Sequence, residues 1–273
     1  MRIIKHFIKG KRPNQSLCED GWVVTNDFAA VVDGSTSKVA GRNGGRRAME
    51  LVCEALHLLT ADADKEQMLT WLTEAVAAHN APEALANAAY RLTCSAVIYS
   101  RHRRVVWMVG DCQCRMGGHT LTNGKRVDDI LTKARVGAAH YLLEHGHSLA
   151  DLQHNDLARA LIMDALREQT NFQNDTNLCN PYRYAVIDGT PIDPALVPEW
   201  KVPAEVHELI LASDGYPTLL DSWQQTEGHL RELLKRDPLC INDNAATKGL
   251  MAGNDSFDDR CYLRLEVGLG LGG

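Results

Sequence analysis

Apolar runs that pass directly into acidic residues are the feature of this sequence that most constrains its fold. Short runs of β-branched, aromatic and small apolar residues, bounded by turn residues, are typical of buried strands. The acidic residues at the ends of such runs are Asp33, Asp111 and Asp214, and those just before a run are Glu19–Asp20 and Asp258–Asp259. If the strand ends converge, acidic segments that are far apart in the sequence meet at one place.

Carboxylates that are brought together repel one another, and the pKa of at least one rises unless a cation neutralises them. Hard divalent cations such as Mg²⁺ and Mn²⁺ prefer oxygen ligands from carboxylates, carbonyls and water. The alternative is that each Asp-Gly pair only forms a turn. Asp188–Gly189, which follows Ala185–Ile187, has the same appearance, so spacing alone leaves both interpretations open.

The order of the expected elements indicates an α+β fold. The predicted strands are Gly21–Val24, Phe28–Val32, Thr93–Ser100, Arg104–Val109, Cys114–Leu121, Tyr184–Ile187, His207–Ala212 and Cys261–Val267. The predicted helices are Arg46–Thr60, Lys65–His79, Ala84–Tyr90, Arg126–Glu144, Leu149–Gln169 and Thr226–Lys235. Several strands are joined by short loops, which favours antiparallel neighbours, and helices do not alternate strictly with strands. We expect a single domain over residues 1–273 with a helical insert at about 125–180.

Composition narrows the class of protein. The net charge is −6 over 273 residues, which argues against a nucleic-acid-binding protein. No apolar run is long enough to span a membrane, and the basic N-terminus lacks the apolar core of a secretory signal. The eight cysteines include no C-x-x-C pair, which is typical of reduced thiols in a cytoplasmic protein. The sequence leaves the oligomeric state open.

The acidic segments, taken in order, resemble the motifs of the protein phosphatase 2C family of metal-dependent Ser/Thr phosphatases. The matching segments are Cys18–Gly21, Val31–Gly34, Val109–Asp111, Ala212–Gly215 and Phe257–Asp259. The resemblance runs from about Asn14 to Val267. It implies a four-layer αββα sandwich of two antiparallel sheets flanked by helices, two divalent cations (Mn²⁺ or Mg²⁺), and phosphorylated proteins as substrates.

The resemblance also implies a role for each acidic residue. The implied metal ligands are Asp20, Asp33, the Gly34 carbonyl, Asp214 and Asp258, with Asp20 and Asp33 at the catalytic centre. Glu19, Asp111 and Asp259 would hold metal-bound water or contribute to a third, weaker metal site. The implied reaction is direct hydrolysis, in which a water that bridges the two cations attacks the phosphorus.

Two departures from the family pattern concern substrate handling. Many members carry a histidine directly after the Asp-Gly, where this chain has Ser35, and the loss of a general acid commonly costs about 10²–10⁴-fold in rate. Many also carry a phosphate-binding arginine at the position that Gln15 occupies here. Basic residues nearby that could bind phosphate instead are Arg12, Lys38, Arg42, Arg46 and Arg47.

Three functions are therefore open. The first is a Ser/Thr protein phosphatase, which the ordered aspartates favour. The second is a catalytically weak relative that binds a phosphorylated partner, which the two departures favour. The third is a phosphatase for small phosphorylated metabolites, because the same chemistry would serve both kinds of substrate.

Overall fold

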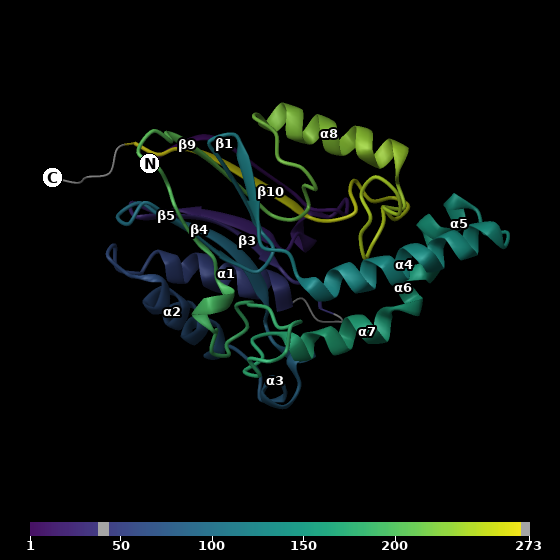
Figure 1. The fold of residues 1–273 in the computed structure, drawn as a ribbon, viewed down its shortest axis with the longest axis horizontal. Coiled ribbons are helices and arrows are strands. Elements are labelled where there is room, and N and C mark those ends of the chain that lie inside the picture. Colours follow the sequence, from purple (N-terminus) through teal and green to yellow (C-terminus); the bar gives the residue numbers. More distant parts are fainter. Residues whose placement is uncertain (38–43, 269–273) are drawn as a thin grey trace.

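Two stacked β-sheets lie between layers of helices in the computed structural model, which describes residues 1–37 and 44–268 (Figure 1). Sheet A consists, in spatial order, of β1 (Arg2–Lys9), β10 (Arg260–Glu266), β9 (Glu208–Ala212), β6 (Gln113–Met116) and β7 (His119–Thr122). Sheet B consists of β2 (Asp20–Val24), β3 (Phe28–Gly34), β4 (Cys94–Ser100), β5 (Val105–Val109) and β8 (Glu199–Lys201). Neighbouring strands are antiparallel throughout both sheets.

Helices cover the outer face of each sheet. α1 (Gly44–Leu56) and α2 (Lys65–Ala77) cover sheet B, and α8 (Trp223–Arg236) covers sheet A. The predicted four-layer αββα sandwich is thereby confirmed. None of the described helices is long and apolar enough to cross a membrane.

The continuous apolar run of β3 follows from its position between two layers. Side chains alternate between the two faces of a strand, so a central strand that is covered on both sides needs apolar residues at every position. Val31 faces the core between the sheets, where it belongs to the same cluster as Leu263 of β10. Val32 faces the opposite way and belongs to the cluster that includes Val52 of α1.

The expected helical insert lies to one side of the sandwich (Figure 1). It contains α4 (Arg126–Glu144), α5 (Leu149–His154), α6 (Leu157–Leu161) and α7 (Met163–Glu168). Ala139 of α4 and Leu152 of α5 belong to one apolar cluster with Leu239 and Ile241, in the loop that follows α8. The insert therefore contacts a segment that is about 100 residues away in the sequence.

Several boundaries differ from the prediction. The strands β1 and β8 were not predicted, and Cys114–Leu121 is a hairpin of β6 and β7 rather than one strand. Tyr184–Ile187 forms only isolated bridges, to Gln173 and Cys94. The predicted helix Leu149–Gln169 is broken into α5, α6 and α7, and Ala84–Tyr90 is α3 (Glu83–Ala86) followed by a 3₁₀ turn.

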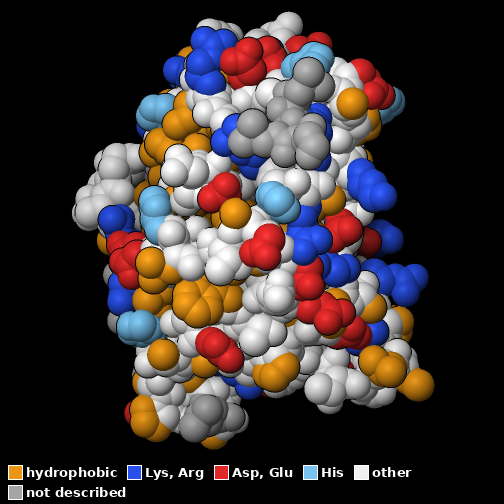
Figure 2. All heavy atoms as spheres, turned by 90° about the vertical axis from the view of Figure 1, so that its left-hand side faces the viewer, with side chains coloured by type: hydrophobic (Ala, Val, Ile, Leu, Met, Phe, Trp, Pro, Cys, Tyr) orange, Lys and Arg blue, Asp and Glu red, His pale blue; other side chains and the backbone are white. Residues whose placement is uncertain are grey.

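The face of the molecule shown in Figure 2 carries charges of both signs. Lys and Arg side chains are interspersed there with Asp and Glu and with apolar side chains. This mixed distribution on that face agrees with the small negative net charge of the whole chain.

Candidate metal centre

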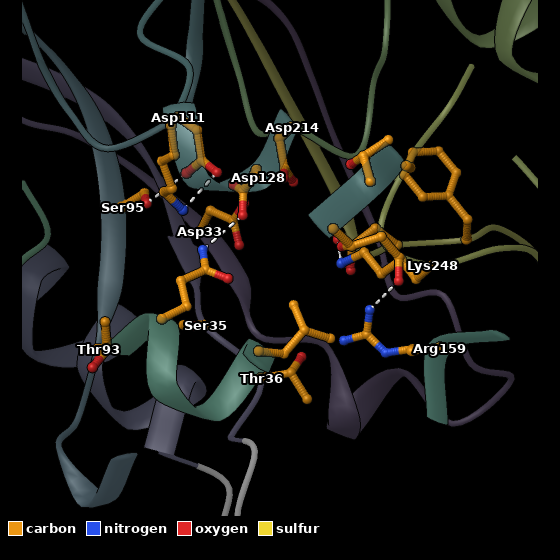
Figure 3. Close-up of a pocket in the computed structure, with 18 of the residues that line it drawn as sticks. Asp33, Ser35, Thr36, Thr93, Ser95, Asp111, Asp128, Arg159, Asp214 and Lys248 are labelled. Atoms are coloured by element: carbon orange, nitrogen blue, oxygen red, sulfur yellow. Dashed lines mark hydrogen bonds and ion pairs between the residues drawn. The ribbon is translucent and has the colours of Figure 1, made fainter. Parts of the chain in front are cut away.

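The acidic centre is built where the ends of sheet A and sheet B meet. Asp20 is the first residue of β2 and lies directly opposite Asp33, the penultimate residue of β3. Residues directly opposite each other on antiparallel strands place their side chains on the same face of the sheet. Asp214 follows β9 of sheet A, and Figure 3 shows its side chain close to that of Asp33.

A cavity of about 570 Å³ opens at this meeting point. Its volume is in the range of pockets that hold small ligands. The predicted site residues that line it are Arg12, Asp33, Gly34, Asp111, Asp214 and Asp258. Asp20 lies behind this lining and is only 2% exposed. The structure thus brings most of the predicted acidic residues to one place, whereas their roles as ligands stay predictions.

Asp20 and Asp214 have carboxylate oxygens that are buried without a partner. Within the described part of the chain, three oxygens accept no hydrogen bond: both carboxylate oxygens of Asp20 and Oδ1 of Asp214. Buried polar atoms of this kind are rare in native proteins, and an unpaired buried charge is costly. A bound divalent cation would satisfy these oxygens, so the residues present fit the metal that the sequence implies.

The pKa values point the same way. Burial, together with the charges of Asp259 and Asp214, outweighs the lowering effect of the nearby Ser213 hydroxyl and raises the pKa of Asp20 to about 7. Burial and then the charges of Asp20 and Asp214 hold the pKa of Asp33 well above its ordinary value. Carboxylates that lie this close together favour either a proton or a cation between them.

Lysines neutralise the carboxylates at the edge of the cluster. Asp258 Oδ1 lies 2.9 Å from Lys11 Nζ, and Asp258 Oδ2 contacts Lys248 Nζ. In residues 1–37 and 44–268, no three His, Cys, Asp or Glu side chains are disposed to hold a metal ion as they stand. Metal binding therefore requires a change of side-chain partners, above all at Asp258.

Asp111 lies at the opposite wall of the cavity, where it is held by two donors. Ser95 Oγ donates to Asp111 Oδ1 at 2.8 Å, and Lys125 Nζ lies 2.7 Å from Oδ2 (Figure 3). Burial opposes the ionisation of Asp111, but Lys125 and Ser95 outweigh it and hold its pKa below the ordinary value. Asp128 lines the same wall and accepts a hydrogen bond from Gln169.

Glu19 and Asp259 organise the backbone around the centre. The Asp259 carboxylate accepts hydrogen bonds from the backbone N–H groups of Lys11 and Glu19, at 2.7 and 3.0 Å. The Glu19 carboxylate accepts a hydrogen bond from the hydroxyl of Thr36. These contacts fix the end of β1, the start of β2 and the segment after β3 against one another.

Glycines allow the close approach of these segments. A Cβ atom on Gly34 would lie 2.4 Å from the carbonyl carbon of Gly45, at the start of α1. A Cβ atom on Gly215 would lie 1.9 Å from the carbonyl oxygen of Asp259. The glycine of each Asp-Gly pair in the centre is therefore required by packing between segments, not only by a turn.

The remaining predicted residues have other surroundings. Arg46 donates to the carbonyl oxygen of Ser16 at 2.8 Å and to the Glu50 carboxylate at 3.1 Å, and it does not line the cavity. Lys38 and Arg42 lie outside the described residues. Asp188, which resembles the site aspartates in sequence, accepts hydrogen bonds from Arg91, Asn174 and Thr190 away from the acidic centre.

The charged residues of the cavity that the sequence does not single out include Lys11, Lys125, Asp128 and Lys248. Lys11 stands beside Arg12 in a basic stretch, which is a weak signal for an anion site. Lys248 lies in a loop without a recognisable motif, and Lys125 and Asp128 lie in the segment that the sequence predicts only as a helical insert. Nothing in their local sequence distinguishes these three from ordinary surface charges.

Comparison with known proteins identifies the family. The family model described as protein phosphatase 2C matches residues 8–238, whereas no curated protein matches the sequence. One similar solved structure is the Ser/Thr phosphatase PstP/Ppp of Mycobacterium tuberculosis, which is 14% identical in sequence. The match covers 98% of this chain and 100% of that chain, with a TM-score of 0.45. Another is the Ser/Thr phosphatase Stp1 of Staphylococcus aureus, with 13% identity, coverage of 98% and 96%, and a TM-score of 0.47. Because the family model spans most of its length, the chain belongs to the protein phosphatase 2C family of metal-dependent protein phosphatases.

Proposed function

We propose that the acidic centre binds two divalent cations, Mn²⁺ or Mg²⁺, and hydrolyses phosphoserine and phosphothreonine in proteins. The observation that carries this proposal is the set of buried, unpartnered oxygens on Asp20 and Asp214 beside Asp33. Cations bound there would lower the pKa of a bound water and neutralise charge on the phosphoryl oxygens.

The roles of the protein groups follow from their positions. Asp33 lies opposite Asp20 in the pairing of β2 with β3, and the charges of Asp20 and Asp214 both raise its pKa, so Asp33 would help to hold the cations. The Gly34 carbonyl lies at the same strand end and can add an oxygen ligand. Asp258 can act as a ligand once its lysine partners leave it.

Asp111 stands apart from this set because Lys125 already neutralises it. We therefore assign the Asp111–Lys125 pair to the wall of the cavity, where each group neutralises the other. A buried ion pair of this kind holds its partners in one geometry at the cost of their hydration.

No histidine follows the Asp33–Gly34 pair, so protonation of the leaving group falls to solvent or to another polar group at the cavity. The expected consequence is a stronger dependence on the leaving group. Substrates whose leaving group has a low pKa should react much faster than phosphoserine peptides.

The test is hydrolysis of para-nitrophenyl phosphate at pH 7–8, with and without Mn²⁺ or Mg²⁺. We expect activity that requires metal and that is lost in Asp33→Asn and Asp214→Asn. Asp164→Asn is the matched control, because that carboxylate is exposed on α7. Titration of metal by calorimetry would give the number of ions. Metal-independent activity, or full activity in Asp33→Asn, would refute the proposal.

Small phosphorylated metabolites remain a second candidate substrate class, because the cavity volume falls in the range of small-ligand pockets. Comparison of phosphopeptides with sugar and nucleotide phosphates at equal concentration would decide between the two. We also propose a cytoplasmic location, which the scattered cysteines without a C-x-x-C pair favour.

A further inference from the structure

Asp258 is paired with two ammonium groups, one of which also lies 3.9 Å from the Asp259 carboxylate. Lys11 Nζ lies on one oxygen and Lys248 Nζ on the other. Lys11 Nζ also donates to the hydroxyl of Thr36 at 3.1 Å. Both lysines line the cavity together with Asp33 and Asp214, so their positive charges face the acidic centre.

Lys11 is held at this position by its own backbone. Its N–H group donates to the Asp259 carboxylate at 2.7 Å, directly after β1 ends at Lys9. Its side chain is only 13% exposed, which leaves the ammonium group inside the cavity rather than in bulk solvent. The contact therefore results from the chain path and not from a mobile surface side chain.

Lys248 is held through the helical insert. Arg159 of α6 donates to the carbonyl oxygen of Thr247, the residue just before Lys248 (Figure 3). Arg135 of α4 donates to the carbonyl oxygen of Ala246 at 2.9 Å. Two arginines of the insert thus fix the loop that presents Lys248 to the site.

Gln15 cannot supply the cation that many family members have at its position. Its side chain is used within the turn after β1: Oε1 accepts from the backbone N–H of Gly10 at 2.8 Å, and Nε2 donates to the carbonyl oxygen of Arg12 at 2.8 Å. The phosphate-binding charge must come from another residue.

We propose that Lys11 and Lys248 bind the phosphate group of the substrate. If Asp258 held a cation, both ammonium groups would lose this carboxylate as a partner, and a phosphate dianion in the cavity would offer acceptor oxygens in its place. The proposal rests on the proposed function for its substrate class. Charge-assisted hydrogen bonds to phosphate are among the stronger polar contacts in proteins.

The experiment compares Lys11→Ala and Lys248→Ala with wild type in two kinds of measurement. Steady-state hydrolysis of para-nitrophenyl phosphate gives kcat and KM, and calorimetry gives the affinity for inorganic phosphate and, separately, for Mg²⁺. Lys9→Ala and Lys235→Ala are the controls. Lys9, at the end of β1, pairs with Asp255, and Lys235 is exposed on α8. Thermal unfolding confirms that each variant is folded.

We expect each alanine variant to raise KM and the dissociation constant for phosphate by about 10- to 100-fold. Mg²⁺ affinity should stay the same or become tighter, because a competing cation has left Asp258. Lys11→Arg and Lys248→Arg retain the charge and should recover part of the phosphate binding. The control variants should match wild type.

Unchanged phosphate affinity and KM in both alanine variants would overturn the proposal. Parallel losses of Mg²⁺ and phosphate affinity would also overturn it, because the lysines would then only support Asp258. If the wild type hydrolyses nothing, the proposed function fails, whereas phosphate binding measured by calorimetry still tests the two lysines independently.

Discussion

Asp20 is a buried carboxylate whose replacement should stabilise the metal-free protein. It is 2% exposed, and neither oxygen receives a hydrogen bond from the described residues. Burial, then Asp259 and Asp214, raise its pKa from 3.8 to about 7. A raised carboxyl pKa means that stability is greatest below pH 3.8 and is lost as the pH rises through about 7. Asp20→Asn removes this loss because an amide does not ionise.

The size of the effect follows from the same values. A rise from 3.8 to about 7 corresponds to about 4 kcal/mol of destabilisation at pH 8. The buried asparagine amide remains unpaired, which costs about 1–3 kcal/mol. The net expectation for Asp20→Asn is a gain in the free energy of unfolding of about 1–3 kcal/mol at pH 8. The gain should be about 2–3 kcal/mol smaller at pH 5, where the wild-type carboxyl is mostly protonated.

The assay is urea unfolding in a metal chelator at pH 5 and pH 8, followed by the same measurement in excess Mg²⁺. An ion at 100 times its dissociation constant should stabilise wild type by about 2.7 kcal/mol, and Asp20→Asn should lose most of this. The exposed control Asp164→Asn should follow wild type in both conditions. If Asp20→Asn is less stable than wild type by the same amount at both pH values, the carboxylate is not an unpaired charge and the reasoning is wrong.

Three further substitutions test the packing and charge around the centre. Gly215→Ala should lower the free energy of unfolding by about 1–3 kcal/mol and weaken Mg²⁺ binding, because the added Cβ would meet a carbonyl oxygen. The control Gly228→Ala adds its Cβ in open space on α8, so it should be neutral or stabilising by up to about 1 kcal/mol. Arg135→Met should cost about 3–5 kcal/mol in urea unfolding, because it leaves a paired carboxylate and several carbonyl groups without their donor. Burial opposes the ionisation of Glu227, but Arg260 outweighs burial and lowers the pKa of this carboxyl below 4.5. The ionised carboxylate therefore stabilises the fold above pH 4.5, and this stabilisation is lost as the pH falls through the lowered pKa. Glu227→Gln should therefore lower the urea midpoint at pH 7 much more than at pH 3.

Each of these has an outcome that contradicts it. Equal stability of the two glycine variants would show that the loop can move away from an added Cβ. An arginine variant as stable as wild type would show that the insert does not hold the loop after α8. An equal effect of the glutamate substitution at both pH values would show that its charge is not what stabilises the fold.

The strands that stand out most clearly in the sequence are those covered on both faces. Phe28–Val32 and Val105–Val109 are continuous apolar runs because each packs between two layers. β1 could not be recognised because it is an edge strand, where polar and apolar residues mix and pairing occurs on one side only. β8 is three residues long, too short for any periodicity to be visible.

The acidic residues could be predicted for a related reason. A side chain at the end of a strand is placed by the register of the sheet, so Asp20 and Asp33 meet wherever β2 pairs with β3. Lys11 and Lys248 belong to loops, and their contacts with Asp258 depend on how several segments pack together. Lys11 lies 247 residues from Asp258 in the sequence, a separation that no local pattern can reveal.

The pairing of β1 with β10 has a consequence for biosynthesis. Arg2 lies opposite Glu266, so β1 cannot find its neighbour until 264 further residues have been made. Strands β2 to β5 can form sheet B earlier, but its inner face, which includes Val31 and Met108, then lacks its cover. Such long-range pairing slows folding and leaves apolar surface exposed to aggregation. Because Asp33 belongs to sheet B and Asp214 follows a strand of sheet A, a metal ion that needs both can bind only after β9 has been made, and it cannot guide the first steps of folding.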